Sequence, residues 1–398
     1  MKVVQVSTYD RGGAFQAAYR LHLALLEKGV DSKVLVLYQY NSGLKEVYSF
    51  LKTGNLLQKI KRSFLYRYFE LLRYFLLPKD SNSQFNFHFS PYTIWEHPIV
   101  ANADIVHLHW VANFIDYFSF FSAPSKPVVW TLHDLHPFSG GFHYEIYSTF
   151  AGSRFLTLNN WVETRKIKSL ELFENLSIVS PSKWLSELSV RSKVFSRFNH
   201  FVIPNGVDSR TFRPKSKIES RRELNLDQNK KIILFLAESL NDPRKGVDDF
   251  YKVLKLCSSL DFLLLTVGNG HLEFDAMENH SIGFVEDEEM MASIYSASDL
   301  FITCSLEDNF PNTVLESVSC GTPVLGYAVG GIFEIVENGR NGFLVEKGDV
   351  TVLANKMMEV LLDDFLLNDL QNKTRNSVRG FASDLQAEKM IELYNRIS

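Results

Sequence analysis

Residues 305–331 read SLEDNFPNTVLESVSCGTPVLGYAVGG and decide the fold of the second half of the chain. The apolar run at 299–304 predicts a strand that ends just before this stretch, and the pattern over 313–320 predicts a helix closed by Gly321. Open sheets of parallel strands bind ligands beyond the carboxyl ends of their strands, where helix N-termini offer unpaired N–H groups to anions. The polar loop between this strand and this helix is therefore the first candidate for a binding site.

Two acidic residues, Asp308 and Glu316, flank the start of the predicted helix. Thr313 and Glu316 also fit a capping box, in which a threonine hydroxyl and a glutamate carboxylate bind N–H groups of their own helix. On this segment alone, ligand binding and helix capping are equally good interpretations of Glu316.

The wider pattern favours ligand binding. It consists of DNFPNTVLE at 308–316, CGTPVL at 320–325 and VGGIFEIVENGRNGFLV at 329–345. Together these resemble the nucleotide-sugar motif of glycosyltransferase family 4, whose members are retaining enzymes of the GT-B fold. The family motif has two glutamates eight residues apart, whereas here the first is the shorter Asp308. The resemblance implies Asp308 and Glu316 as catalytic residues. The donor-binding residues that it implies in this loop are Asn309, Phe310, Pro311, Asn312 and Thr313.

A pair of cations, Arg244 and Lys245, follows the strand predicted at 231–237 and precedes a helix predicted from Val247. An anion there would meet two positive charges together with the positive end of a helix dipole. A solvated basic turn is the alternative interpretation, but PRKG at 243–246 resembles the diphosphate-binding loop of the family. The resemblance implies that Arg244 and Lys245 are catalytic residues.

The resemblance also implies that a loop formed by Gly283, Phe284 and Val285 passes the nucleotide base.

No D-x-D triplet occurs in the sequence, so no obvious carboxylate pair holds Mg²⁺ against a diphosphate. We therefore expect no metal and no other cofactor, with the charge of the leaving group met by cations and N–H groups.

Gly12 and Gly13 stand between a strand predicted at 2–7 and a helix predicted at 14–28. A loop of this kind lets backbone N–H groups approach a phosphate or a sugar, although a tight turn alone also favours glycine. In the family that the sequence resembles, such a loop faces the donor.

The run TLHDLHPFSGGFHY at 131–144 resembles the first domain of family members that build bacterial surface polysaccharides. The resemblance implies that His133 lies beside the donor sugar, with Asp134 also binding substrate; a buried strand-end histidine is the alternative. Many relatives have a cysteine where Phe142 stands, and further cysteines after it. Their absence here predicts that no zinc is bound.

His107 and His109 alternate along a strand predicted over 104–110, which places them on one face. Without a carboxylate or a third ligand nearby, we interpret them as hydrogen-bonded structural residues and not as metal ligands.

The composition excludes several classes of protein. The 398 residues carry a formal charge of −4, so no global basic field indicates nucleic-acid binding. The three cysteines show no paired spacing, which is typical of a reducing compartment. The N-terminus lacks the features of a signal peptide, and no apolar run approaches the roughly 18 residues of a membrane span. We expect a cytoplasmic enzyme.

Residues 56–79 read LLQKIKRSFLYRYFELLRYFLLPK. Their mixture of cations with aromatic and aliphatic residues is typical of an interfacial amphipathic helix, which predicts peripheral attachment to the cytoplasmic membrane face. A surface helix that packs its apolar side on the domain is the alternative. The cations are Lys59, Lys61, Arg62, Arg67 and Arg73.

We predict two facing Rossmann-like α/β domains of the GT-B fold, with the active site in the cleft between them. Residues 1–205 form the acceptor domain, which ends at Asn205 in the family-like sequence IPNGVD, and residues 206–385 form the nucleotide-sugar domain. The resemblance also implies that Asn205 binds substrate. Residues 386–398 form a helix that returns to the first domain. The hydrophilic stretch 212–230 is the expected linker.

The implied reaction moves a sugar from a nucleotide-diphosphate donor to a glycan or lipid-linked acceptor with retention of configuration. Its implied setting is bacterial lipopolysaccharide, O-antigen or capsule synthesis. Two other classes stay open at this stage: an epimerase or phosphorylase of the same fold, and a catalytically silent sugar-nucleotide-binding module. Asp308 in place of glutamate keeps the silent module open.

Overall fold

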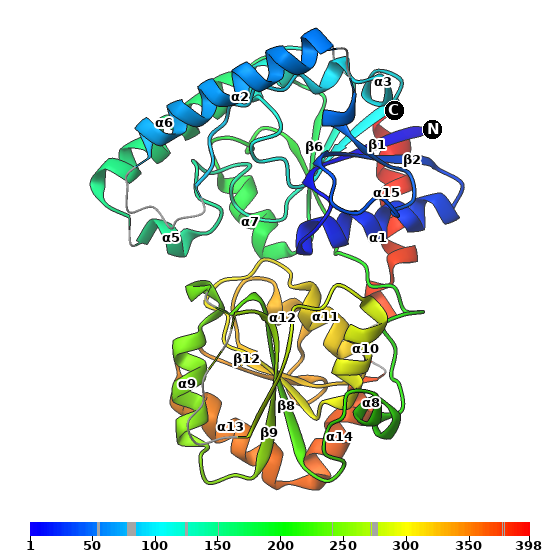
Figure 1. Ribbon diagram of the computed structural model, residues 1–398, viewed down its shortest axis with the longest axis vertical. Helices are drawn as coiled ribbons and strands as arrows, with labels where there is room; N and C mark the ends of the chain where they lie inside the picture. Colours follow the sequence, from blue (N-terminus) through cyan, green and yellow to red (C-terminus); the bar gives the residue numbers. More distant parts are fainter. Residues whose placement is uncertain are drawn as a thin grey trace. The chain divides into compact units, whose positions relative to one another are not determined.

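The computed structural model describes residues 1–53, 56–77, 85–123, 126–149, 151–240, 242–270, 272, 278–375, 377 and 379–398, without the side chains of 56–63, 72–73 and 379. It divides into two compact units (Figure 1). Unit 1 consists of Met1–Pro204 and Gln386–Ser398, and unit 2 consists of Asn205–Leu385.

Unit 1 is built on a parallel sheet of seven strands in the order β3-β2-β1-β4-β5-β6-β7. The strands are β1 (Lys2–Tyr9), β2 (Asp31–Tyr38), β3 (Val47–Ser49), β4 (Ile105–Leu108), β5 (Val128–Thr131), β6 (Leu176–Ser180) and β7 (Asn199–Val202). The helices are α1 (Gly13–Glu27), α2 (Leu56–Leu76), α3 (Pro98–Ala101), α4 (Tyr117–Phe121), α5 (Glu145–Thr149), α6 (Ser153–Leu170), α7 (Lys183–Arg191) and α15 (Ser383–Ile397). Two short 3₁₀ turns are η1 (Phe50–Lys52) and η2 (Ile94–Glu96).

The two faces of this sheet are buried in different apolar clusters. Val4 and Val6 of β1 pack in one cluster and Val3 packs in another, because successive side chains of a strand point to opposite faces. The second cluster is closed by Leu21 of α1 and Tyr394 of α15, both fully buried. Coverage on both faces is what an all-parallel sheet requires.

Unit 2 is built on a parallel sheet of six strands in the order β10-β9-β8-β11-β12-β13, with one continuous apolar core. The strands are β8 (Lys231–Ser239), β9 (Phe262–Asn269), β10 (Asn279–Gly283), β11 (Leu300–Thr303), β12 (Val324–Tyr327) and β13 (Gly342–Val345). The helices are α8 (Lys217–Glu223), α9 (Val247–Leu256), α10 (Glu288–Ala297), α11 (Asn312–Ser319), α12 (Ile332–Ile335), α13 (Val350–Leu362) and α14 (Asp364–Thr374). Two short 3₁₀ turns are η3 (Pro243–Lys245) and η4 (Arg379–Phe381).

The prediction of a linker over 212–230 is wrong. This stretch contains α8 and belongs to unit 2. Arg221 of α8 is buried and donates from Nη2 to the Asp299 carboxylate at 2.7 Å and from Nε to the Ala297 carbonyl at 3.0 Å. The charged residues that looked like a solvated linker therefore include a cation held in an internal ion pair.

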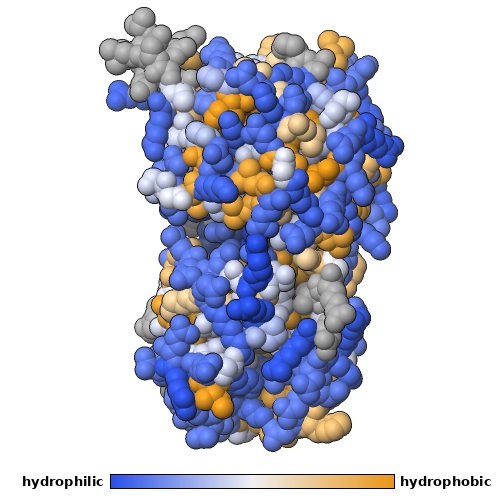
Figure 2. All heavy atoms as spheres, turned by 90° about the vertical axis from the view of Figure 1, so that its right-hand side faces the viewer, coloured by the Kyte–Doolittle hydropathy of each residue, from blue (hydrophilic) through white to orange (hydrophobic). Residues whose placement is uncertain are grey.

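Most of the large apolar side chains of both units are buried. On the face that Figure 2 shows, apolar side chains form separate patches among hydrophilic ones. Within the described part of the chain, no helix combines the length and the apolar character needed to cross a membrane.

Candidate functional site

Each sheet has one point where the strand order reverses, between β8 and β11 in unit 2 and between β1 and β4 in unit 1. Parallel α/β sheets bind ligands at such switch points, because the loops that follow the two strands turn away in opposite directions. Arg244 and Lys245 follow β8, Asp308 follows β11, and Gly12 follows β1. These four residues thus lie at the two switch points.

At the unit 2 switch point, two cations share one carboxylate. Lys245 Nζ lies 2.7 Å and Arg244 Nη1 3.1 Å from Oδ2 of Asp308. Arg244 Nη1 also donates to the Glu307 carbonyl at 2.9 Å, and its Nη2 lies 3.4 Å from the Asp242 carboxylate. The adjacency of β8 and β11 brings these charges together across more than sixty residues of sequence.

Two glycines allow this close packing of loops. Gly246 has φ +66°, and a Cβ there would lie 1.9 Å from the Cys304 carbonyl oxygen. Gly330 has φ +53°, and a Cβ there would lie 1.6 Å from the Asp308 carbonyl oxygen. Both the left-handed backbone and the lack of space require glycine at these positions.

Asp308 is buried. Burial by itself raises the pKa of its carboxyl, but Lys245 and Arg244 outweigh burial and the pKa is lowered. Burial, together with the charge of Arg244, lowers the pKa of Lys245. Asp308 therefore acts as the charged partner that holds both cations in position.

Helix α11 begins at Asn312, and its N-cap is Pro311, with no side-chain cap. The capping-box interpretation is therefore wrong, because Thr313 is the second residue of the helix and not its N-cap. Glu316 instead accepts a hydrogen bond at 3.0 Å from the hydroxyl of Tyr295, a fully buried residue of α10.

The remaining predicted residues of this loop lie close to the helix start. Asn205 Nδ2 donates to Oδ1 of Asn312 at 3.5 Å. Asn309 is buried, and the ring of Phe310 lies 5.8 Å from that of Phe381. The structure thus groups Asn205 with the loop after β11.

The predicted base-binding residues lie at the end of β10, which is an edge strand of the sheet. Gly283 has φ +82° and open space where a Cβ would be, and Phe284 is exposed. Val285 packs on the apolar core. Because β9 separates β10 from β8, this loop lies farther along the sheet edge than the cations do.

In unit 1, the glycine loop after β1 is tied to the loop after β2. Gly12 has φ +85° and directly precedes α1, whose first residue is Gly13. The Asp10 carboxylate accepts the backbone N–H groups of Tyr40 and Asn41, each at 2.8 Å. These bonds fix the loop in which the two glycines lie.

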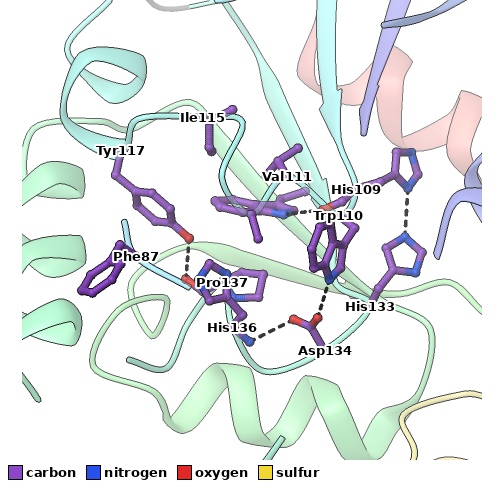
Figure 3. A pocket seen from close by; sticks show the side chains of 12 residues that line it. Phe87, His109, Trp110, Val111, Ile115, Tyr117, His133, Asp134, His136 and Pro137 are labelled. Carbon is purple, nitrogen blue, oxygen red and sulfur yellow. Dashed lines mark hydrogen bonds between the residues drawn. The ribbon is translucent and has the colours of Figure 1, made fainter. Parts of the chain in front are cut away.

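His107 and His109 lie side by side with ring centroids 4.3 Å apart, which confirms that they share a face of β4. His107 is hydrogen-bonded through Nδ1 to the Tyr394 hydroxyl at 2.6 Å and through Nε2 to the Thr131 hydroxyl at 2.7 Å. Burial lowers its pKa to about 3. The interpretation of both residues as hydrogen-bonded structural histidines is confirmed, since His109 is bonded to His133 (Figure 3).

The hydrogen bonds of His109 determine the tautomer of His133. Oε1 of Gln5 accepts from His109 Nε2 at 2.6 Å, so Nδ1 of a neutral His109 is an acceptor. His133 Nε2 lies 3.1 Å from that Nδ1 and must therefore donate. Burial lowers the pKa of His133 to about 4, so its ring is neutral and its own Nδ1 is a hydrogen-bond acceptor.

Both carboxylate oxygens of Asp134 accept hydrogen bonds from residues of unit 1. Oδ2 accepts from Trp110 Nε1 at 2.8 Å, and Oδ1 accepts from the His136 backbone N–H at 3.0 Å (Figure 3). Oδ2 also accepts from His143 Nδ1 at 2.5 Å. Burial by itself raises the pKa of Asp134, but the charge and hydrogen bond of His143 outweigh burial and lower the pKa. Asp134 thus fixes the indole and the loop beside His133.

A buried lysine near this network has no counterpart in the sequence prediction. Lys166 Nζ donates to the Gly140 carbonyl at 2.7 Å and to the His136 carbonyl, and it lies 5.2 Å from the ring of Tyr117. Burial lowers its pKa well below the usual value. No sequence signal could have found it, because Lys166 stands in a helix rich in charged residues that are otherwise mostly exposed.

Two family models match the chain. The model described as Glycosyltransferase Family 4 matches residues 11–211, and the model described as Glycosyl transferases group 1 matches residues 216–377.

Relatives of known activity match part of the chain. The N-acetyl-alpha-D-glucosaminyl L-malate synthase of Bacillus anthracis is 26% identical over 203 residues, 49% of this chain and 52% of that protein. The UDP-Gal:alpha-D-GlcNAc-diphosphoundecaprenol alpha-1,3-galactosyltransferase of Escherichia coli is 29% identical over 206 residues, 48% of this chain and 53% of that protein. The chain spans about half the length of the curated relatives it matches.

Solved structures match the whole chain. Sucrose-phosphate synthase from Thermosynechococcus elongatus has a TM-score of 0.71 at 18% identity and covers 100% of this chain and 99% of its own. Anabaena HepE in complex with UDP has a TM-score of 0.67 at 16% identity and covers 100% of both chains. At these identities the likeness shows the fold alone.

Proposed function

Because the chain belongs to glycosyltransferase family 4 and has the GT-B fold, we propose that it transfers a sugar from a nucleotide-diphosphate donor to a glycan or lipid-linked acceptor. The transfer retains the anomeric configuration, requires no metal, and serves bacterial surface-polysaccharide synthesis at the cytoplasmic membrane face. The observation that carries the proposal is a pair of cations at the switch point of unit 2, the buried Arg244 and the half-buried Lys245. The name of the Escherichia coli relative, which includes a diphosphoundecaprenol acceptor, supports a lipid-linked acceptor.

The cations suit a diphosphate leaving group. Negative charge grows on the leaving diphosphate as the glycosidic bond breaks, so cations held in place beforehand stabilise the transition state more than the ground state. Asp308 supplies that fixed position, since it contacts both cations. The N-terminus of α11, eight residues long, adds backbone donors at the neighbouring strand.

The same ion pairs also fit a catalytically silent binding module, because Asp308 neutralises charge that a donor would otherwise meet. A thermal-shift screen with UDP, GDP, ADP and their sugars separates binding from its absence, since a ligand at about 100 times its Kd stabilises by about 2.7 kcal/mol. Detection of glycosylated acceptor in the presence of EDTA then separates a metal-independent transferase from the silent module. Nucleotide binding with no glycosylated product on any acceptor tried would favour the module, and an epimerised or phosphorolysed sugar would identify the remaining class.

We assign His133 to the donor sugar, where its neutral Nδ1 accepts a hydrogen bond from a sugar hydroxyl near the reacting carbon. Replacing His133 with alanine is expected to lower turnover while nucleotide affinity stays close to normal, because the side chain contacts sugar and not nucleotide. The measurements are kcat on the active donor and the Kd of the free nucleotide. His133→Gln, which keeps a hydrogen-bonding side chain, should retain more turnover than His133→Ala. Equal losses of turnover and nucleotide affinity in both variants would indicate that His133 only maintains the fold.

We assign Glu316 to the ribose diol of the nucleotide, because a carboxylate accepts hydroxyl hydrogen bonds and repels phosphate. Glu316→Gln is expected to weaken nucleotide binding by roughly 10- to 100-fold, the scale of a hydrogen bond to a charged group. The amide oxygen can still accept from Tyr295, so the melting temperature should stay close to that of the wild type.

The control for this variant is Tyr295→Phe, which removes the internal partner of Glu316 and should lower the melting temperature with little change in nucleotide affinity. Isothermal titration with the nucleotide identified in the screen measures the nucleotide affinity of both variants. A thermal melt measures their melting temperatures. A Glu316→Gln protein that lost only thermal stability would show that Glu316 has a structural role alone.

A further inference from the structure

Helix α2 presents a row of large apolar side chains to solvent. Phe64, Tyr68, Leu71 and Phe75 are 73%, 56%, 56% and 67% exposed. Their spacing of four, three and four residues places them along one face of the helix. We call these four residues the α2 ridge.

The ridge is separate from the side by which α2 packs on unit 1. The ring of Phe69 lies 5.2 Å from that of Phe89, and Leu76 and Leu77 pack on an apolar cluster that includes Phe155 of α6. Figure 1 shows α2 at the periphery of unit 1. One apolar face of α2 therefore packs on the domain, whereas a second is exposed. Membrane attachment of this helix stays a prediction.

The charge of α2 is opposite to that of the chain as a whole. The helix has five basic residues and one acidic residue, Glu70, so its formal charge is 5 − 1 = +4, whereas the whole chain carries −4. Arg67 is exposed, and Lys61 and Arg67 stand three residues before and after Phe64, which are neighbouring positions on a helix surface. The side chains of Lys59, Lys61, Arg62 and Arg73, and all of Lys79, lie outside the described residues.

We propose that the α2 ridge is a docking surface for anionic lipid, with its rings and Leu71 in the headgroup region and the neighbouring Arg67 against lipid phosphates. Aromatic and aliphatic side chains beside Lys and Arg are the composition that binds the interface of an anionic bilayer. A second copy of this chain is a poorer occupant, because two α2 helices of +4 would face one another. The proposal does not depend on transferase activity, since docking needs neither donor nor acceptor.

Cosedimentation of the full chain with vesicles tests the proposal. At low salt, binding is expected to vesicles of equal parts phosphatidylcholine and phosphatidylglycerol, and much weaker binding to phosphatidylcholine alone. The triple variant Phe64→Ser, Leu71→Ser, Phe75→Ser should have a partition coefficient into the vesicles lower than that of the wild type by roughly tenfold or more, because apolar insertion is lost. Since these side chains are already in water, the variant should keep the wild-type melting temperature.

A matched control removes equally exposed apolar side chains from elsewhere on the surface. Leu172→Ser, Leu362→Ser, Phe365→Ser should bind vesicles as the wild type does. Arg67→Glu should weaken binding at low salt and have less effect at high salt, where charges are screened.

Three results would overturn the proposal: wild-type protein that stays in the supernatant with anionic vesicles at low salt, a ridge variant that sediments like the wild type, or a ridge variant matched by the control. A wild-type dimer that the ridge variant dissociates, with vesicle binding unchanged, would assign the ridge to a second copy. Each of these results leaves the proposed transferase activity untouched, because the vesicles contain no donor and no acceptor.

Discussion

Replacing Lys245 with alanine is expected to lower turnover by about 10²- to 10³-fold, the scale of losing one preorganised donor that stabilises charge in a transition state. Lys245 Nζ is held 2.7 Å from Asp308 in a half-buried site beside Arg244, so little reorganisation is needed when the leaving diphosphate gains charge. The loss should appear mainly in kcat, because the extra charge on the diphosphate exists only as the bond breaks.

Two variants separate catalysis from folding in this experiment. Lys245→Arg keeps a cation and should retain more turnover than Lys245→Ala, at a similar melting temperature. Lys252→Ala removes an exposed lysine that pairs with Asp249, and it should leave turnover unchanged because exposed ion pairs contribute little. A Lys245→Ala enzyme with normal turnover on every active donor would exclude the assignment.

Acidification is expected to unfold unit 1 before unit 2. Among the described residues, burial lowers the pKa of seven histidines, and all seven lie in unit 1. They are His22, His88, His107, His109, His133, His136 and His200.

The sign follows from the protons bound by each state. A histidine whose pKa is lowered by folding stays neutral in the folded protein, whereas in the unfolded chain it binds a proton below a pH of about 6.5. The stability it contributes is complete above that value and is lost as the pH falls toward the folded pKa, which is about 4 for His22, His88 and His133. Each such group changes the free energy of unfolding by up to about 1.4 kcal/mol per pH unit, so several together remove on the order of 5 kcal/mol.

Tryptophan fluorescence measures this transition in unit 1 alone, because all five tryptophans of the chain lie there. The unfolding midpoint in urea, followed by fluorescence, should fall steeply between a pH of about 6.5 and about 4.5. Calorimetry over the same range should show a transition of unit 2 that moves less. His88→Gln should make the dependence shallower by about one proton, and a fluorescence midpoint that is flat over this range would contradict the prediction.

The sequence alone determined the class of fold. Apolar runs that alternate with helical patterns predict parallel strands, because the period of two or 3.6 residues is a local property of each segment. The loops after β8 and β11 were found for the same reason, since turn residues mark the ends of strands. The shared face of His107 and His109 follows from strand alternation and is also local.

The tertiary structure alone decided which of these residues meet. Asp308 and Lys245 are far apart in sequence and pair only because β11 lies beside β8, a strand order that no local pattern encodes. Thr313 fits a capping box by spacing, yet the helix begins one residue earlier because Pro311 takes the N-cap position. The sequence alone places Arg221 in a solvated linker, and only packing against Asp299 explains its burial. Residue spacing and composition are local properties that the sequence shows directly. The hydrogen-bond and ion-pair partners of a residue, and its burial, depend on contacts between distant segments, which form only in the folded protein.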